Sequence, residues 1–268
     1  MDINSSFSYS SLTSAGQGIQ TGSERISSGL RINNAQDDAA GLAISNRMGA
    51  EIRGFSQSIR NANDGISMLE TASGSLSGIT ENIQRIRELA IQAGNGTLNS
   101  SDRAALNKEA QQLLDEVNRT VETTTFNQQP LLKNSQDVSL QIGPKADDQL
   151  TLAKNDFAQK LEDAGFADID LSSAEGASSA LGVLDQVQTD VDNASANIGA
   201  ESNRLESTIN SLSLAEEKAS ASRSRIRDAD MAKETSQLVN EQVREQASIN
   251  MLFIDNANRG NILKLLGQ

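Results

Sequence analysis

An apolar repeat with alternating intervals of three and four residues covers residues 184–229, and it constrains the fold more than any other feature. Of the 14 positions that it selects, 11 are apolar. Such a repeat is typical of one side of a coiled coil. No proline interrupts it, so it predicts a helix over about residues 180–229, ~75 Å long at 1.5 Å per residue. A helix of this length needs partner helices to cover its apolar side. The selected positions are Leu184, Val187, Val191, Ala194, Ile198, Glu201, Leu205, Thr208, Leu212, Ala215, Ala219, Ser222, Ile226 and Ala229.

Two upstream segments carry the same repeat and are the expected partners. The first is a helix over about residues 42–94, with a shift of register after Leu69 and a break at Asn95-Gly96. The second covers about residues 102–124, where Ser101 or Asp102 can cap the helix. We therefore expect a mainly α fold, built as a long antiparallel coiled-coil rod. The apolar positions are Ile52, Phe55, Ile59, Ala62, Ile66, Leu69, Leu76, Ile79, Ile83, Ile86, Ala90 and Ala93, then Leu106, Ala110, Leu113, Val117 and Val121.

The middle of the chain has a different pattern. Apolar residues alternate with polar ones from Val138 to Ile142 and again at Leu150 and Leu152. Residues 143–148 between them are rich in Gly, Pro and Asp, which favour turns. The pattern predicts a β-hairpin over about residues 137–153 that packs on the rod. Residues 153–182 have weak periodicity and are expected to form a connection with short helices, too short for another domain.

Both ends of the chain are amphipathic, although the ends of soluble domains are usually polar and frayed. We expect a terminal two-helix coiled coil, and two ways of burying its apolar residues stay open: the two segments can cover each other, or many copies can meet at an axis. The apolar residues are Ile3, Phe7, Leu12, Ala15, Ile19 and Ile26 at one end, and Val239, Val243, Ala247, Met251, Ile254, Leu263, Leu265 and Leu266 at the other.

The composition excludes several kinds of chemistry. The 268 residues include no cysteine and no histidine, which leaves no thiol or imidazole catalysis, no disulfide and no usual zinc site. The acidic pairs Asp37-Asp38 and Asp147-Asp148 are expected to be helix caps or turn residues. No glycine-rich phosphate loop is present. We expect no enzyme, no cofactor and no metal.

The charge narrows the class of partner. With 36 acidic and 23 basic residues the net charge is −13, which disfavours nucleic acid and anionic membranes. No apolar run is long enough to span a bilayer. The segment that begins at Met1 has no basic patch before an apolar stretch, so no cleavable secretory signal is expected. The protein is then expected to be either cytoplasmic or exported by a route that recognises a signal other than a cleavable secretory one.

Several long motifs resemble those of bacterial flagellins. Near the start they are SERISSGLRINN at residues 23–34, AQDDAAGLAISNRM at residues 35–48 and RNANDGIS at residues 60–67. QRIRELAIQ follows at residues 84–92, and SRSRIRDAD at residues 222–230 and Gln246-Ala247 lie near the far end. The motifs occur in the family's order and at both ends of the chain.

The resemblance implies a structural subunit that assembles into the flagellar filament, outside the cell, after uncleaved passage through the flagellar type III export pathway. It implies an inner-core domain of residues 1–40 with 230–268 that folds on assembly. It also implies a rod domain of residues 41–229, and no outer variable domain. The implied partners are identical subunits, an export chaperone, the filament cap, hook-associated proteins and, for some family members, host Toll-like receptor 5.

The resemblance also assigns residues to these contacts. It places the receptor contact at Arg85, Leu89 and Glu109. Seven polar residues match the family's core–rod junction, namely Arg31, Asn33, Asp37, Asp38, Arg60, Asn63 and Asp64; the alternative is that they only cap helices and form solvated ion pairs. With the terminal apolar residues, the expected assembly set is Ile3, Phe7, Leu12, Ile19, Ile26, Arg31, Asp37, Asp38, Arg60, Asn63, Val239, Val243, Leu252, Ile262, Leu263, Leu265 and Leu266.

The chain departs from the family pattern at a few places. The start reads Ile3-Asn4-Ser5-Ser6, and the last segment contains Leu252-Phe253-Ile254 and later Arg259-Gly260. These departures affect the chemistry expected at the filament lumen. Two alternatives to a filament subunit stay open: a hook–filament junction protein of the same superfamily, and an intracellular signalling coiled coil. The latter would need a membrane segment or an output domain.

Overall fold

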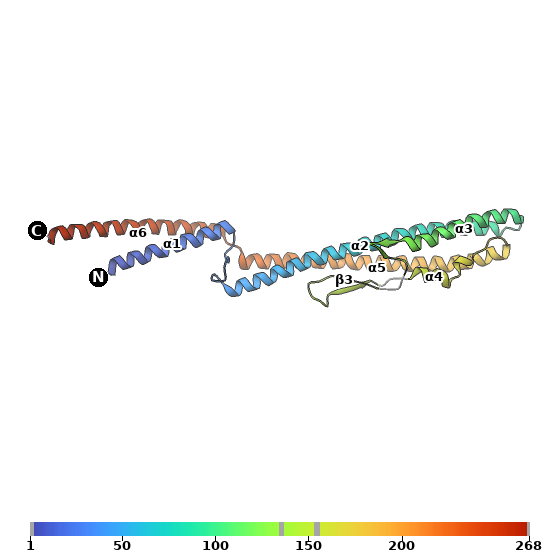
Figure 1. The fold of residues 1–268 in the computed structure, drawn as a ribbon, viewed down its shortest axis with the longest axis horizontal. Coiled ribbons are helices and arrows are strands. Elements are labelled where there is room, and N and C mark those ends of the chain that lie inside the picture. The colour runs from blue at the N-terminus through green and yellow to red at the C-terminus, as the bar shows by residue number, and fades with distance from the viewer. Residues whose placement is uncertain (1–2, 134–136, 153–155, 267–268) are drawn as a thin grey trace. The chain divides into compact units, whose positions relative to one another are not determined.

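The computed structural model describes residues 3–133, 137–152 and 156–266 (Figure 1). The chain divides into two compact units. We call Met1–Ile52 with Glu217–Gln268 the terminal unit, and Arg53–Glu216 the rod unit. Two long helices, α2 (Ala39–Ala93) and α5 (Ala174–Arg227), contribute residues to both. None of the described helices is long and apolar enough to cross a membrane.

The rod unit is a helical coiled coil with a continuous apolar core, as the repeat predicts. The helix α3 (Ser100–Thr123) packs with α2 and α5. Seven α2 residues of the repeat are at most 2% exposed, and α5 buries most of its own repeat from Leu184 to Leu212. The α2 residues are Ala62, Leu76, Ile79, Ile83, Ile86, Ala90 and Ala93. The mainly α fold with its coiled-coil rod is therefore confirmed.

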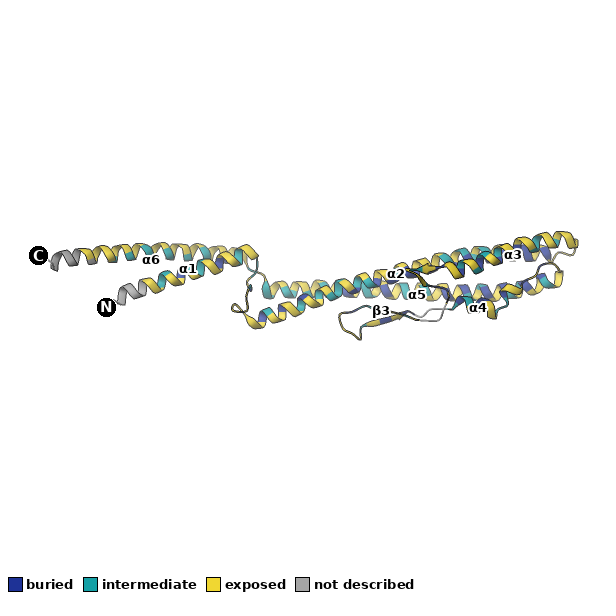
Figure 2. Cartoon of the chain, viewed as in Figure 1, coloured by how far each residue is buried: buried dark blue, intermediate teal, exposed yellow. Residues whose placement is uncertain are grey.

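Burial along the repeat depends on how many elements surround it. Phe55 and Ile59 in the first part of the rod unit are half-buried, whereas Ile79 and Ile83 beside α3 are fully buried. Two helices alone cover only part of each apolar face. The first part of the rod therefore keeps accessible apolar surface, and Figure 2 shows dark blue positions concentrated toward the α3 end.

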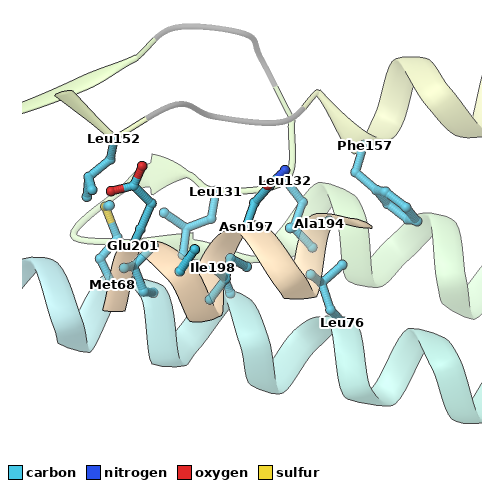
Figure 3. A pocket seen from close by; sticks show the side chains of 13 residues that line it. Met68, Leu76, Leu131, Leu132, Leu152, Phe157, Ala194, Asn197, Ile198 and Glu201 are labelled. Carbon is cyan, nitrogen blue, oxygen red and sulfur yellow. The ribbon is translucent and has the colours of Figure 1, made fainter. Parts of the chain in front are cut away.

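One polar position of the repeat, Glu201, lies at a gap in the core. A cavity of about 220 Å³ opens beside it, lined mainly by apolar side chains from α2, α5 and the segments around Leu132 and Leu152 (Figure 3). The Glu201 Oε2 atom is buried and accepts no hydrogen bond from the described residues, with Arg204 Nη1 at 3.7 Å. A charged group needs room for water or a cation, so tight packing is interrupted here.

The N-terminus of α3 is capped by Asn99. Its side chain accepts a hydrogen bond from the Asp102 amide at 2.9 Å, and the Asp102 side chain accepts one from the Asn99 amide in return. This reciprocal pair is a capping box. The expectation of a cap at Ser101 or Asp102 is thus wrong by two or three positions, because Asp102 acts as the third helical residue rather than as the cap.

A β-hairpin packs on α2, as the alternating pattern predicts. Strand β3 (Val138–Gln141) pairs antiparallel with β4 (Gln149–Leu152), with Val138 opposite Leu152. The Asn61 side chain of α2 donates a hydrogen bond to the Gln141 carbonyl at 2.8 Å. At Gly65 the hairpin comes so close that an added Cβ would lie 2.5 Å from Leu140 Cδ1. The expected end of the hairpin at residue 153 lies outside the described residues.

We expect Gly65→Ala to destabilise the rod unit by about 1–3 kcal/mol, because the methyl group must displace Leu140 from a packed position. The matched control is Gly74→Ala, also within α2, where an added Cβ meets nothing within 4 Å. That change should stabilise the helix by about 0.5–1 kcal/mol. Urea unfolding of both variants measures the two effects, and equal effects would contradict this packing.

A second, smaller hairpin lies just after α3 and has no counterpart in the sequence-based expectations. Strand β1 (Thr125–Phe126) pairs with β2 (Gln129–Pro130) through Asn127 and Gln128, whose φ angles are 48° and 65°. Positive φ at both turn residues suits a tight hairpin. The strands have only two residues each, too few for an alternating pattern to be visible.

The connection before α5 contains short helices, as expected. Asp156 caps α4 (Phe157–Asp163), and a 3-10 helix η1 (Phe166–Asp168) follows after Gly165, whose φ is 70°. Phe157 and Phe166 are at most 1% exposed and anchor this segment to the core. The helix α5 begins at Ala174, earlier than the expected position near residue 180.

The terminal unit pairs the first and last helices. α1 (Ile3–Ser28) packs along α6 (Met231–Leu266), and Figure 1 shows the blue and red helices side by side. Close packing is permitted by small residues on α1: Ala15 is 2% exposed, and a Cβ added at Gly22 would lie 3.4 Å from Leu238. The expected terminal two-helix pair is therefore present.

Candidate assembly site

One face of α6 is apolar and exposed. Val239, Val243, Met251 and Ile254 are 56–63% exposed, and Ala247 between them is also exposed. At 100° per residue these five positions lie within about a third of the helix circumference. Contiguous exposed apolar surface of this kind marks interaction sites. Figure 2 shows α6 mostly yellow and teal, and Glu234 is its one buried position among the described residues.

The opposite face of α6 contacts α1. Leu238 lies against Gly22, and Glu241 lies against Gly18, where its Cγ is 3.0 Å from the position of an added Cβ. Leu252 continues this half-buried face. The Val239–Ile254 face (Val239, Val243, Ala247, Met251 and Ile254) therefore lies mostly on the side of α6 away from α1. At its edge, Ala247 and Met251 line a hollow that α1 also borders. Pairing of the two terminal helices thus buries part of the terminal apolar residues and leaves this face largely exposed. Its burial against other copies stays a prediction.

The expected assembly residues of α1 have a different position. Leu12, Ile19 and Ile26 are half-buried, at heptad spacing with the buried Ala15 and Gly22. They belong to the face that packs on α6 within one molecule. The assembly residues expected at the two extremes have side chains outside the described residues, and they are Ile3, Phe7, Ile262, Leu263, Leu265 and Leu266.

The segment between α1 and α2 is hydrogen-bonded to the region where α5 ends. The Arg31 amide donates to the Arg227 carbonyl at 2.7 Å, and Arg31 Nη2 donates to the Ile226 carbonyl at 2.6 Å. The Ala229 amide donates to the Gly29 carbonyl at 2.9 Å, and Gly29 has φ of 70°. Arg31 therefore acts within the subunit, and fixes where the chain turns from α1 toward α2.

Asp37 and Asp38 close the same turn. The Asp37 carboxylate accepts hydrogen bonds from the Asn34 and Asn33 amides, both at 3.0 Å, and lies 3.6 Å from Arg25. Those backbone hydrogen bonds, followed by the Arg25 charge, lower the pKa of Asp37. Asp38 Oδ1 accepts a hydrogen bond from the Gly41 amide at 2.8 Å, which caps α2. Asp38 is thus a helix cap and Asp37 a turn residue, the two roles expected for this acidic pair.

The lowered pKa of Asp37 makes the turn sensitive to acid. A carboxylate whose pKa is lower in the folded state stabilises it above the ordinary pKa of about 3.9, and this contribution is lost as pH falls through the lowered value. We expect the stability difference between the native chain and Asp37→Asn to be constant above about pH 5 and to shrink below about pH 4. Acid titrations of helical circular dichroism test this, with Asp64→Asn as an exposed control. A difference that grows below pH 4 would contradict the assignment.

Arg25 also joins α1 to α6. Its Nη1 atom lies 3.7 Å from Glu234, whose side chain is 8% exposed, although Arg25 Nε is buried and donates no hydrogen bond in the described structure. The sequence-based set missed both residues. Glu234 in the first turn of a helix looks like an ordinary exposed acid, and only the tertiary structure shows that it is buried.

The other junction residues are not close to this turn along α2. Arg60, Asn63 and Asp64 belong to the rod unit, whereas Arg31, Asn33, Asp37 and Asp38 belong to the terminal unit. Arg60 donates to Gln57 Oε1 at 2.6 Å, and Asn63 donates to the Ile59 carbonyl at 2.8 Å. The seven residues therefore fall in two groups along the chain, of which the one on the rod is exposed, and their role at a core–rod junction stays a prediction.

The three residues that the resemblance assigns to a receptor contact differ in their exposure. Arg85 of α2 pairs with Glu109 of α3 at 2.7 Å and with Glu88 at 2.8 Å, and both Arg85 and Glu109 are about half exposed. The hydrogen bonds to Glu88 and Glu109 raise the pKa of Arg85. Leu89 is 1% exposed and lies in the core. Its side chain offers almost no surface to a partner, so the described structure favours an indirect role for Leu89.

The net charge is divided unevenly between the units. Residues 53–216 carry 24 acidic and 12 basic side chains, whereas the terminal unit carries 12 and 11. The terminal helices are therefore nearly neutral, and copies can approach them without strong repulsion. The rod accounts for almost all of the net charge, which salt would screen between neighbouring rods.

Models of protein families match most of the chain. The bacterial flagellin N-terminal helical region matches residues 2–137, and the bacterial flagellin C-terminal helical region matches residues 181–266. The chain belongs to the bacterial flagellin family. A flagellin of Halalkalibacterium halodurans is 43% identical over 92% of this chain and 91% of its own length. A flagellin of Bacillus subtilis is 37% identical over 95% of both chains.

Solved structures agree with this assignment. The crystal structure of Bacillus cereus flagellin superposes with a TM-score of 0.52 and 29% identity, over 57% of this chain and 88% of that one. A putative flagellar hook-associated protein from Vibrio parahaemolyticus has a TM-score of 0.60, 14% identity, and coverage of 72% and 100%. At this identity the second likeness shows the fold alone.

Family membership fixes the coarse function of this flagellin. It is a structural subunit of the flagellar filament with a helical coiled-coil rod, and its short length fits a minimal flagellin. The signalling coiled coil is accordingly not supported. In the described part of the chain, no group of three or more His, Cys, Asp or Glu side chains could hold a metal ion.

Proposed function

We propose that this flagellin polymerises by burying the Val239–Ile254 face of α6 against other copies of itself. The supporting observation is the position of this face, which is apolar, more than half exposed at its large residues and turned away from α1. Burying one valine side chain fully stabilises an interface by about 1.5 kcal/mol or more. Because contacts between identical rods in a helical lattice do not close, they extend into a filament.

The exposed polar residues of the rod are proposed as lateral contacts. Among the described residues, the side chains of Arg60 and Asn63 bond to Gln57 and Ile59 of the same helix, and both residues are exposed to a neighbouring rod. Residues 1–40 with 230–268 would form the inner core of the filament, and residues 41–229 the surrounding shell with no outer variable domain. Assembly places the protein outside the cell, and the family's type III export pathway is the proposed route.

The further partners follow from the family. We propose an export chaperone, the filament cap and hook-associated proteins as binding partners during export and growth. Host Toll-like receptor 5 is the proposed external partner, with Arg85 and Glu109 as the contact and Leu89 as a positioning residue. The Arg85–Glu109 pair joins α2 to α3 at the surface, and Leu89 belongs to the buried core to which both helices contribute.

Seeded polymerisation separates a filament subunit from a hook–filament junction protein. Purified protein added to sheared filament seeds should give long filaments whose length grows with monomer concentration, as seen by electron microscopy. A junction protein would add a short layer and then stop. Growth that ends after a short layer at every concentration would replace the proposed function by the junction role.

A further inference from the structure

The loop between α2 and α3 contains Asn95-Gly96, the single Asn-Gly dipeptide of the sequence. The Asn95 side chain is folded back toward the following main chain, because its Oδ1 atom accepts a hydrogen bond from the Thr97 amide at 3.1 Å. This is an Asx turn. The Asn95 side chain is thereby held on the side of the main chain that follows it, toward Gly96 and Thr97.

Gly96 leaves this peptide accessible. Both residues are exposed, and an added Cβ at Gly96 would meet nothing within 4 Å. Within the described residues the Gly96 amide donates no hydrogen bond. The other side of the same peptide is held, because the Asn95 carbonyl accepts hydrogen bonds from the Leu98 amide at 3.3 Å and from Arg103 at 3.0 Å. Once these exposed bonds open, glycine permits the backbone rotation that brings the Gly96 nitrogen to Asn95 Cγ.

Two comparable dipeptides lie inside helices, where the backbone cannot rotate to allow the same attack. Asp64-Gly65 lies inside α2, where Gly65 is buried against Leu140 and the backbone is held by helical hydrogen bonds. Asn193-Ala194 lies inside α5 in the same way, although Asn193 is exposed. Neither can bring the next amide nitrogen onto its side-chain carbonyl carbon without breaking the helix.

We propose that Asn95 is a site of spontaneous deamidation. The Gly96 nitrogen, after losing its proton to water or hydroxide, attacks Asn95 Cγ and forms a C–N bond. The Cγ–Nδ2 bond breaks, and Nδ2 leaves as ammonia after gaining a proton. The five-membered succinimide ring then takes up one water, which opens either carbonyl and gives aspartate or isoaspartate. No electron is gained or lost, and water is the only other reactant.

The modification changes a loop that is otherwise well connected. Arg103 donates hydrogen bonds to the Ala93 carbonyl at 2.9 Å and to the Asn95 carbonyl at 3.0 Å. The new carboxylate lies just after the C-terminal end of α2, where the helix dipole disfavours negative charge. The isoaspartate product also routes the main chain through Cγ and lengthens the loop by one backbone atom. Each event thus adds a negative charge to the acidic rod and alters the α2–α3 connection.

Peptide mass mapping of the full chain tests the proposal. The purified protein is incubated at mildly alkaline pH, and the Asn95 peptide is followed over days, with isoaspartate detected by enzymatic methylation. We expect Asn95 to convert while Asn193 and Asp64 stay unchanged in the same sample. Gly96→Ala should slow conversion by roughly tenfold or more, because its methyl group hinders the attack. That variant should fold normally, since the added Cβ enters open space.

Two results would overturn the assignment. The first is conversion of Asn95 no faster than that of Asn193. The second is an unchanged rate in Gly96→Ala while circular dichroism shows the native helix content. Neither result bears on filament growth, so this proposal and the proposed function fail independently.

Discussion

Replacing Val243 by aspartate is expected to abolish filament growth. Val243 is 63% exposed at the centre of the Val239–Ile254 face, so the change leaves the isolated molecule folded. In the filament the same position would lose the burial of a valine, about 1.5 kcal/mol or more, and would bury an unpaired charge at a larger cost. Because each 1.4 kcal/mol is a factor of ten, the critical concentration should rise by ~100-fold or more.

The matched control for this variant is Gln242→Asp. Gln242 is also exposed and is the neighbouring residue, but it lies outside the apolar face. Gln242→Asp therefore adds the same negative charge to α6 as Val243→Asp does. Sedimentation of seeded reactions measures both variants, and thermal unfolding checks that the monomers are equally stable. Similar inhibition by both aspartates would show that added charge on α6, and not the apolar face, limits growth.

Replacing Leu89 by alanine is expected to destabilise the rod unit by about 2–5 kcal/mol, because it leaves a cavity in the packed core. Leu89 is 1% exposed and belongs to the continuous core of α2, α3 and α5. Ile91→Ala is the control on the same helix, since Ile91 is 60% exposed. Its effect should stay within about 0.5 kcal/mol. Urea unfolding of both variants distinguishes a core residue from a surface residue, and equal effects would contradict the burial of Leu89.

The Leu89 variant and Arg85→Ala together separate direct from indirect receptor contact. Arg85→Ala removes an exposed side chain and should weaken binding of the receptor ectodomain at unchanged stability, whereas Leu89→Ala should weaken binding only as far as it unfolds the rod. Arg119→Ala is the matched control, because Arg119 forms a comparable exposed ion pair with Glu116 on α3. Loss of binding in Leu89→Ala at temperatures where the rod is fully folded would restore Leu89 as a direct contact.

The rod and the hairpin were predictable because their signals are local and repeated. The apolar repeat from Leu184 to Leu212 reports burial at each turn, and the alternation at Val138, Leu140 and Ile142 reports a strand with one packed face. Sequence motifs at both ends also placed the chain in its family. The repeat and the alternation follow from the period of a regular helix or strand, so both can be recognised in the sequence.

The features that the sequence did not reveal depend on tertiary contacts. Glu234 is buried and lies close to Arg25 because α1 pairs with α6. The residue spacing within either helix does not predict this contact. The apolar residues of α6 were visible, but the repeat alone did not show that Val239 and Val243 point away from α1. Similarly, the receptor motif gave the identities of Arg85 and Leu89 but not their opposite exposures.

Thiol labelling of Val243→Cys in monomer and filament tests the central claim most directly. The native chain contains no cysteine, so a single introduced thiol reports on one position. With Gln242→Cys as the neighbouring comparison, the thiol of Val243→Cys should react quickly in the monomer and become strongly protected in filaments, then react again after the filaments are depolymerised. Equal labelling of that thiol in monomer and filament would contradict burial of the α6 face on assembly.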